Sequence, residues 1–134
     1  MKGNYYLPIA CVTLLFLFNA CTSEQTTRLP KPDPDNAGLK LPNGFGAIVT
    51  ADNVGKARHL AVSEYGDLYV KLRVPREGHG IIALRDNDGN GIMDEQKGFM
   101  PYGGTGIAYY NGYLFCSSDT NIYRYKLNLG ELVP

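Results

Sequence analysis

The chain has 134 residues, with 13 basic and 13 acidic side chains, so its formal net charge is zero. It contains no block of Lys or Arg, and nothing in the charge pattern therefore supports nucleic-acid binding. After the N-terminal apolar run there is no amphipathic stretch long enough to suggest a helical domain.

The first 20 residues predict a signal peptide. Met1 and Lys2 give a positively charged start, residues 5–18 are mostly apolar, and small Ala20 ends the segment. This order is typical of a secretory signal, and the apolar run is too short for a comfortable membrane span. We therefore expect an exported protein.

The cysteine that follows this segment is typical of bacterial lipoproteins. Cys21 would become the lipidated first residue of the mature chain, anchored on the periplasmic side of a membrane or at the cell surface. Phe18 and Asn19 depart from the usual lipobox, so an ordinary signal peptide followed by a chance cysteine is the alternative. Cys11 would be removed with the signal, and Cys116 is then left to act as a small buried hydrophobic residue.

Residues 21–40 predict a disordered tether. The segment is polar, and Pro30, Pro32 and Pro34 alternate with charged residues. Such a composition buries too little apolar surface to fold, and its prolines favour an extended chain. Behind a lipidated cysteine it would hold a domain away from the membrane.

Residues 41–134 predict an all-β domain. A Pro-Asn-Gly turn at residues 42–44 precedes an expected strand at residues 45–49. Residues 59–72 then predict two strands joined by a turn at residues 65–67. Their apolar residues alternate with others, as in a half-buried strand pair; these residues are Leu60, Val62, Leu68, Val70 and Leu72.

A longer connection is expected at residues 73–80, before a third strand at residues 80–84. It carries Arg73, Arg76, Glu77 and His79. Extra length in a connection is often functional, although a solvated loop of any kind carries the same residue types.

The acidic segment after the third strand is the one local motif with metal chemistry. Asp86, Asp88 and Asn90 occupy positions 1, 3 and 5 of the EF-hand calcium loop, and Ile92 would offer its carbonyl at position 7. Asp94 stands at position 9.

Position 12 of this pattern fails. Lys97 stands where calcium loops carry a bidentate Glu, and Glu95 is the available substitute. The segment therefore predicts a weak calcium site with a structural role, and an acidic turn without a metal is the alternative.

A second unit repeats the first about 45 residues later, in the manner of repeat proteins. Residues 106–115 predict two strands around the Asn111-Gly112 hairpin turn, and residues 121–125 predict a third strand. Two similar β units at this spacing predict a β-propeller, in which each unit is a blade.

Taken together, these segments resemble the N-terminal part of the L-sorbosone dehydrogenase-like proteins, which are similar to soluble glucose dehydrogenases. The resemblance covers residues 41–134. Its segments are residues 41–45, 57–62, 66–70, 83–91, 104–108, 111–115 and 122–125. It implies a six-bladed propeller that uses pyrroloquinoline quinone (PQQ) to oxidise a sugar or aldehyde outside the cytoplasm.

The resemblance assigns no catalytic or quinone-binding residue in this chain. In the family, a histidine base and basic residues around the quinone come largely from later blades, and neither His59 nor His79 matches the motif of the base. Residues 41–134 leave room for about two blades, whereas a propeller needs four or more. We therefore expect a truncated or partial chain, with pairing to other subunits as the alternative.

Three interpretations of function remain open. The first is the N-terminal part of an exported PQQ-dependent sugar or aldehyde dehydrogenase, inactive by itself. The second is a non-catalytic, calcium-binding lipoprotein module that uses a propeller-like surface for binding. The third is a remnant without activity.

Overall fold

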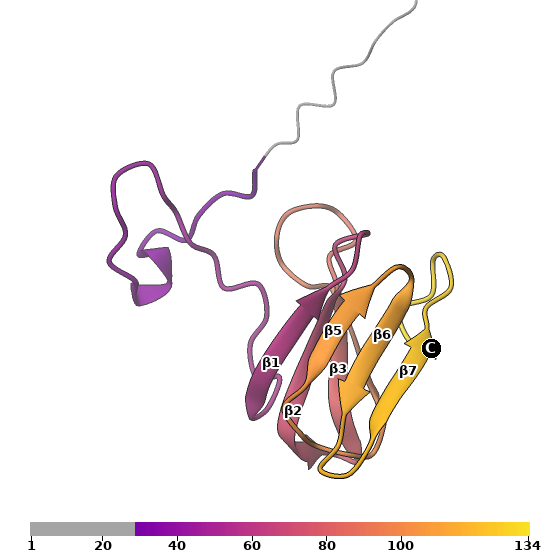
Figure 1. Cartoon of the computed structure of the whole chain (residues 1–134). Coiled ribbons are helices and arrows are strands. Elements are labelled where there is room, and N and C mark those ends of the chain that lie inside the picture. Colours follow the sequence, from indigo (N-terminus) through magenta and orange to yellow (C-terminus); the bar gives the residue numbers. More distant parts are fainter. Residues whose placement is uncertain (1–28) are drawn as a thin grey trace, which may run out of the picture.

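The computed structural model describes residues 29–134, and this part of the chain is all-β (Figure 1). Two antiparallel sheets are accompanied by a single short 3-10 turn, η1 (Asn36–Gly38), within the described range. The predicted all-β class is therefore confirmed for these residues. The predicted signal peptide, residues 1–20, and Cys21 lie outside them. No helix in residues 29–134 is long and apolar enough to cross a membrane.

The first sheet contains four strands, each hydrogen-bonded to the next along the chain. They are β1 (Ala57–Val62), β2 (Leu68–Arg76), β3 (His79–Arg85) and β4 (Glu95–Phe99). The strand pair predicted over residues 59–72 is confirmed as the β1–β2 hairpin. Its turn is closed by buried Ser63, whose hydroxyl accepts the N–H of Asp67 at 3.1 Å.

The long loop predicted over residues 73–80 is wrong. β2 continues to Arg76 and β3 begins at His79, so only Glu77 and Gly78 form the turn. Both have positive φ, 52° and 81°, as a type I′ hairpin turn requires. The outer half of β2 is exposed and irregular around Pro75, so it lacks the apolar alternation by which a strand is recognised.

The second sheet repeats this arrangement with three strands, β5 (Ile107–Tyr110), β6 (Tyr113–Ser117) and β7 (Ile122–Lys126). The predicted turn at Asn111 and Gly112 is present, with φ of 48° and 77°. β5 lies beside β1 of the first sheet (Figure 1). The two sheets do not close into a ring within residues 29–134, so the propeller stays a prediction.

The strand predicted at residues 45–49 is wrong. This segment is part of an irregular loop in which the carboxylate of Asp33 accepts the N–H of Val49 at 2.8 Å, and Asn36 accepts the N–H of Ala47. Side chains thus take the backbone groups that a neighbouring strand would otherwise pair. The loop lies away from the sheets (Figure 1), and its Phe45 is 72% exposed. The described part of the predicted tether, residues 29–40, belongs to the same loop, and its role as a tether stays a prediction.

One hydrophobic core joins the inner faces of the two sheets. The first sheet contributes Ala61, Tyr69, Ile81, Ala83 and Phe99, and the second contributes Ile107, Leu114 and Cys116. Tyr69 lies edge-on to Phe99, and its hydroxyl donates to the carbonyl of Leu132 at 3.1 Å. Each fully buried large side chain in such a core contributes about 1.5–3 kcal/mol. The core therefore holds the two sheets and the C-terminal segment together.

The outer face of the first sheet carries a second apolar cluster. Val70, Leu72, Ile82 and Leu84 are buried there, partly under Ala51, Val54 and Met93. Leu60 and Val62 lie on the same face but are 57% and 50% exposed. The apolar alternation predicted for the strand pair is thus present. However, β2 and β3 are buried on both faces, because the sheet lies between two layers.

Candidate functional site

The acidic loop is held by the hairpin from which it projects. It connects β3 to β4, and at its neck the N–H of Asp94 donates to the carbonyl of Arg85 at 2.8 Å. Arg85 and Glu95 are cross-strand partners. Because the strands pair up to this point, Asp86 and Asp94 begin and end the loop at neighbouring places.

Three carboxylates meet in this loop. Asp86, Asp88 and Asp94 each present one oxygen within 4.8 Å of the others. Asp86 also accepts the N–H of Gly91 at 2.7 Å and of Gly89 at 2.8 Å. The hydrogen bond from Gly91 is the main reason that the pKa of Asp86 lies below its usual value. The oxygens are hard ligands of the kind that Ca²⁺ prefers, although exposed acidic groups of this kind also occur without an ion.

The other predicted ligands have hydrogen-bond or ion-pair partners next to this cluster. Asn90 accepts the N–H of Ile92 at 2.7 Å and donates to Asp88 at 2.9 Å. Glu95 belongs to β4 and forms an ion pair with Lys97 at 2.6 Å. Of the four predicted carboxylate ligands, the structure brings Asp86, Asp88 and Asp94 together and gives Glu95 a different partner.

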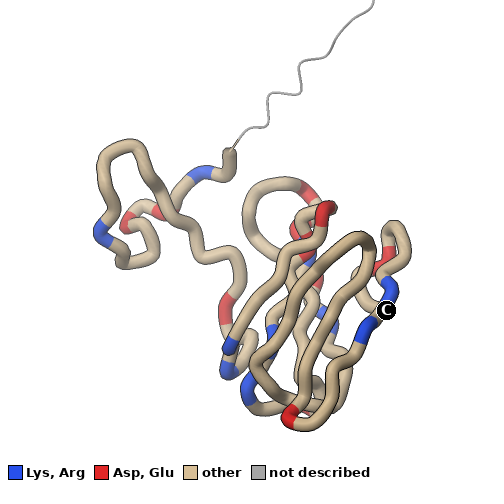
Figure 2. Tube along the Cα trace, viewed as in Figure 1, with Lys and Arg blue, Asp and Glu red and all other residues tan. Residues whose placement is uncertain are grey.

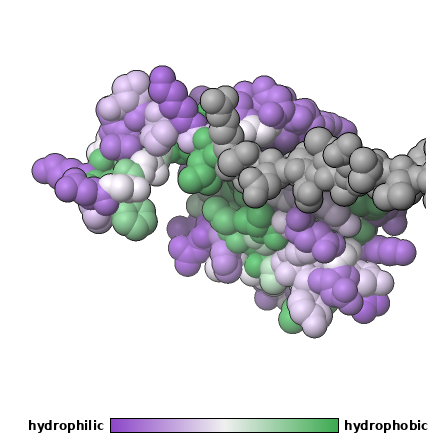
Figure 3. All heavy atoms as spheres, turned by 90° about the horizontal axis from the view of Figure 1, so that it is seen from above, coloured by the Kyte–Doolittle hydropathy of each residue, from purple (hydrophilic) through white to green (hydrophobic). Residues whose placement is uncertain are grey.

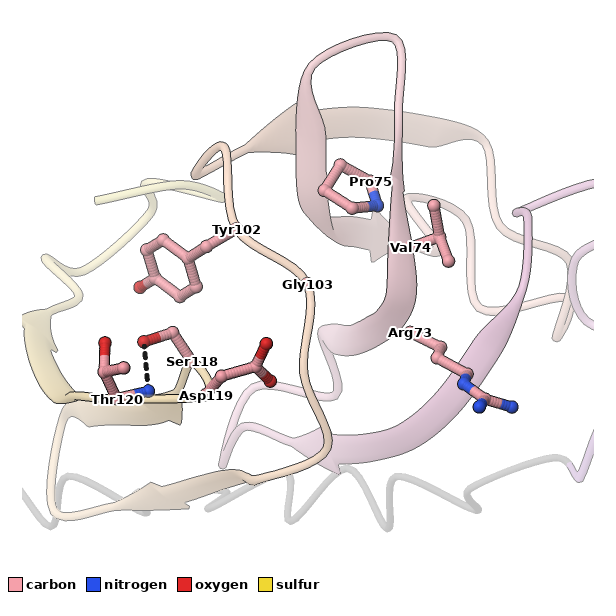
Figure 4. Close-up of a pocket in the computed structure, with 8 residues that line it drawn as sticks. All are labelled: Arg73, Val74, Pro75, Tyr102, Gly103, Ser118, Asp119 and Thr120. Carbon is pink, nitrogen blue, oxygen red and sulfur yellow. Dashed lines mark hydrogen bonds between the residues drawn. The ribbon is translucent and has the colours of Figure 1, made fainter.

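A second candidate site is a pocket of about 430 Å³ between the two sheets (Figure 4). Its walls come from β2, from the connection between the sheets and from the turn between β6 and β7. The lining residues are Arg73, Val74, Pro75, Tyr102, Gly103, Ser118, Asp119 and Thr120. In Figure 4, the guanidinium of Arg73 points away from the carboxylate of Asp119. The lining offers the hydroxyls of Ser118 and Thr120 and the carboxylate of Asp119, and the Ser118 hydroxyl accepts the N–H of Thr120 at 3.3 Å.

A buried lysine fixes one wall of this pocket. Lys71 is fully buried, its ammonium donates to the carbonyl of Tyr102 at 2.8 Å, and it lies 4.3 Å from the centre of the Tyr102 ring. Burial lowers the pKa of Lys71. The hydroxyls of Tyr102 and Tyr125 share a hydrogen bond of 2.6 Å, and Tyr102 stacks on Tyr123. The connection between the sheets is therefore attached to both of them.

Neither histidine is placed as a general base. His59 lies on the exposed edge strand β1, beside an apolar groove, and His79 begins β3, where its ring packs against Gly98. No described hydrogen bond joins either imidazole to a hydroxyl or thiol in residues 29–134.

Sequence analysis missed the pocket and its lysine. Lys71 stands between Val70 and Leu72, at the polar position of the alternation, so the pattern predicts an exposed side chain and gives no signal of its burial. Tyr102 and Asp119 lie in connections whose mutual approach depends on how the sheets pack. No local pattern in the sequence indicates that these two connections lie close together.

Comparison with known proteins found no match. No protein-family model, no curated protein and no solved structure resembles this chain closely enough to be recognised.

The buried thiol of Cys116 predicts a pH dependence of stability. Burial raises its pKa from 9.0 to about 11, although Lys71 acts in the opposite direction. The folded protein keeps this proton where the unfolded chain loses it. The contribution of the protonated Cys116 thiol to the free energy of unfolding is therefore complete below pH 9 and is lost as the pH rises toward 11. At a pH near 10 the loss amounts to about 1 kcal/mol.

Urea denaturation of the wild type and a Cys116→Ala variant, at about pH 8 and about pH 10, tests this. The variant is less stable at both pH values because of the cavity, but it loses about 1 kcal/mol less between them. Tyr69, whose pKa is raised to about 12, titrates in both proteins and cancels in the comparison. Equal losses in the two proteins would contradict the assignment.

Proposed function

We propose that this chain is an exported lipoprotein that supplies two neighbouring blades of a β-propeller of the PQQ-dependent sugar dehydrogenase type. The supporting observation is the repeated antiparallel sheet, packed face to face with its predecessor so that first strands β1 and β5 lie side by side. In a propeller, corresponding strands of neighbouring blades line the central channel in this way. The sequence resemblance over residues 41–134 supplies the chemical class.

The catalytic groups of such an enzyme belong to other blades. The pocket between the two sheets offers one guanidinium, on exposed Arg73, together with the carboxylate of Asp119. This is a poor match for a quinone that carries several carboxylates, because Asp119 repels the anion and a single cation cannot balance it. This pocket therefore does not fit PQQ, and we assign no catalytic step to its residues.

This proposal predicts that the chain by itself does not oxidise sugars. Catalysis with a bound quinone requires a positioned base in a site that excludes water, and two sheets leave the pocket open to solvent. Full-length chain is supplied with calcium, excess PQQ and a panel of aldoses and aldehydes, and dye reduction is measured. The expected rate equals that of free PQQ. Turnover above this background would show that two blades suffice.

Export and anchoring form a second part of the proposal. The apolar segment ending at Ala20, followed by Cys21, supports lipidation on the non-cytoplasmic side of a membrane. Metabolic labelling with a fatty acid should mark the wild type and leave a Cys21→Ser variant unlabelled, whereas a Cys116→Ser variant should label normally. Equal labelling of the Cys21→Ser variant would exclude the anchor.

A non-catalytic calcium-binding module is the alternative function. The specific observation in its favour is the approach of Asp86, Asp88 and Asp94 at the tip of the β3–β4 hairpin. A bound cation would offset the repulsion among three carboxylates and rigidify the loop. Its role would be structural, since the hairpin tip lies apart from the pocket residues.

Calcium titration separates this alternative from an acidic turn without a metal. Millimolar calcium should raise the melting temperature of the wild type, because a ligand that binds only the folded state stabilises it. Asp88→Asn should weaken this response strongly. Glu95→Gln is the matched control and should leave it nearly unchanged, since Glu95 pairs with Lys97. A wild-type melting temperature that does not respond to calcium would rule the site out.

A further inference from the structure

The two sheets have the same register. In the first sheet the cross-strand pairs of β1 and β2 are Leu60 with Val70, Ala61 with Tyr69, and Val62 with Leu68. In the second sheet the pairs of β5 and β6 are Ile107 with Cys116, Ala108 with Phe115, and Tyr109 with Leu114. The third strands, β3 and β7, follow the same register. Lys71 of β2 and Ser117 of β6 are equivalent positions, and they pair with Ile81 and Ile122 respectively. The paired positions of β5, β6 and β7 therefore have equivalents in β1, β2 and β3.

Equivalent positions differ in burial. Ile107 is buried against the first sheet, whereas its equivalent Leu60 is 57% exposed. Ile81 is fully buried against the second sheet, whereas its equivalent Ile122 is 83% exposed. The internal interface is thus formed by two different faces of one repeated unit. We call them the front face, which the first sheet uses, and the back face, which the second sheet uses.

One face of each kind is left over among residues 29–134. The free part of the back face belongs to the first sheet and is the strip of exposed Leu60 and Val62 on β1, beside an apolar groove bordered by Val49 and Val54. The rest of this face, on β2 and β3, is already partly covered by Ala51, Val54 and Met93. The free front face belongs to the second sheet. It carries Ala108, Phe115, Ser117 and Ile122 at the positions equivalent to Ala61, Tyr69, Lys71 and Ile81.

The free faces are apolar over β1, β5 and β6. β5 and β6 carry no charged residue, and the charges of the second sheet lie on β7 and in the turns (Figure 2). Arg124 and Lys126 of β7 lie on the front face, where Arg124 pairs with Phe115 and covers the ring of Tyr113. Seen from above, hydrophobic residues gather near the middle of the view, with polar residues around them (Figure 3). Exposed apolar residues grouped in this way mark an interaction surface.

We propose that the free back face of one molecule receives the free front face of a second copy of this chain. The occupant follows from the internal interface, in which a front face already covers a back face of the same repeated unit. The inference deepens the proposed function by naming the partner, and it rests on the proposed blade arrangement. Leu60 and Val62 of one copy then pack against Ile122, Phe115 and Ala108 of the next.

This contact joins different faces and is therefore head-to-tail. Head-to-tail contacts close into a ring when the rotation between subunits allows it. Propellers contain four to eight blades, so a ring built from two-blade chains contains about two to four copies. Closure would also cover the sheet edges that an open pair of sheets exposes.

The test uses the full-length chain in detergent and measures mass by sedimentation equilibrium. Wild type should sediment as a closed oligomer of defined size. Leu60→Asp damages the back face and Ile122→Asp damages the front face, so each variant alone should sediment as a single chain. Mixed together, the two variants should form a one-to-one dimer and nothing larger, because one intact face of each kind remains.

Leu129→Asp is the matched control. Leu129 is also apolar and 78% exposed, but it lies on neither face, so this variant should assemble like the wild type. Circular dichroism and thermal melting confirm that each variant is folded. A wild type that stays monomeric at micromolar concentration would overturn the inference and indicate that other blades or another protein cover these faces. Failure of the mixture to dimerise would exclude the head-to-tail contact. Dye reduction is therefore also measured on the Leu60→Asp variant, which should be a single chain, so that the test of the proposed function does not depend on assembly of the wild type.

Discussion

The packing of the inner face of the first sheet on the second is the interaction on which the rest of the structure depends. It buries Tyr69, Ile81, Leu114 and Cys116 in a single core. Burial of apolar surface is the main favourable contribution to folding, and neither sheet could bury this face alone. The outer face of the first sheet is covered only in part, so β2 and β3 lie between two apolar layers while β1 stays exposed on one side.

Polar contacts fix the geometry that this packing allows. Arg85 holds Asp67 through two hydrogen bonds of 2.7 and 2.8 Å and also donates to the carbonyl of Gly130. It thereby connects the first hairpin turn, the base of the acidic loop and the C-terminal segment. At the opposite end, buried Lys71 attaches the connection between the sheets through Tyr102. A charge-assisted bond of this kind is stronger than a neutral one, and an unpaired buried charge would be costly.

The candidate sites lie at these two ends. The acidic loop projects beyond Arg85, and the pocket is bordered by Tyr102, so both depend on contacts that the core makes possible. The repeated register of the two sheets carries the functional proposals, because it defines a unit with two unlike faces. Such a unit can extend by adding further units of the same kind.

The sequence by itself determined the local elements. Apolar alternation and turn residues predicted the β1–β2 hairpin, β3, β6 and β7, and the spacing of carboxylates predicted the acidic loop. Sequence patterns gave wrong predictions in two places, one where side chains bind the backbone groups of an expected strand and one where a strand is exposed to solvent. Asp33 and Asn36 take the backbone groups of residues 45–49, and the exposed end of β2 lacks apolar alternation. Only the tertiary structure decided which face of each sheet is buried, that Lys71 lies beneath Tyr102, and that Glu95 turns from the acidic cluster toward Lys97. These outcomes depend on contacts between segments far apart in the chain or on the side of a strand that a neighbour covers, and no local period encodes them.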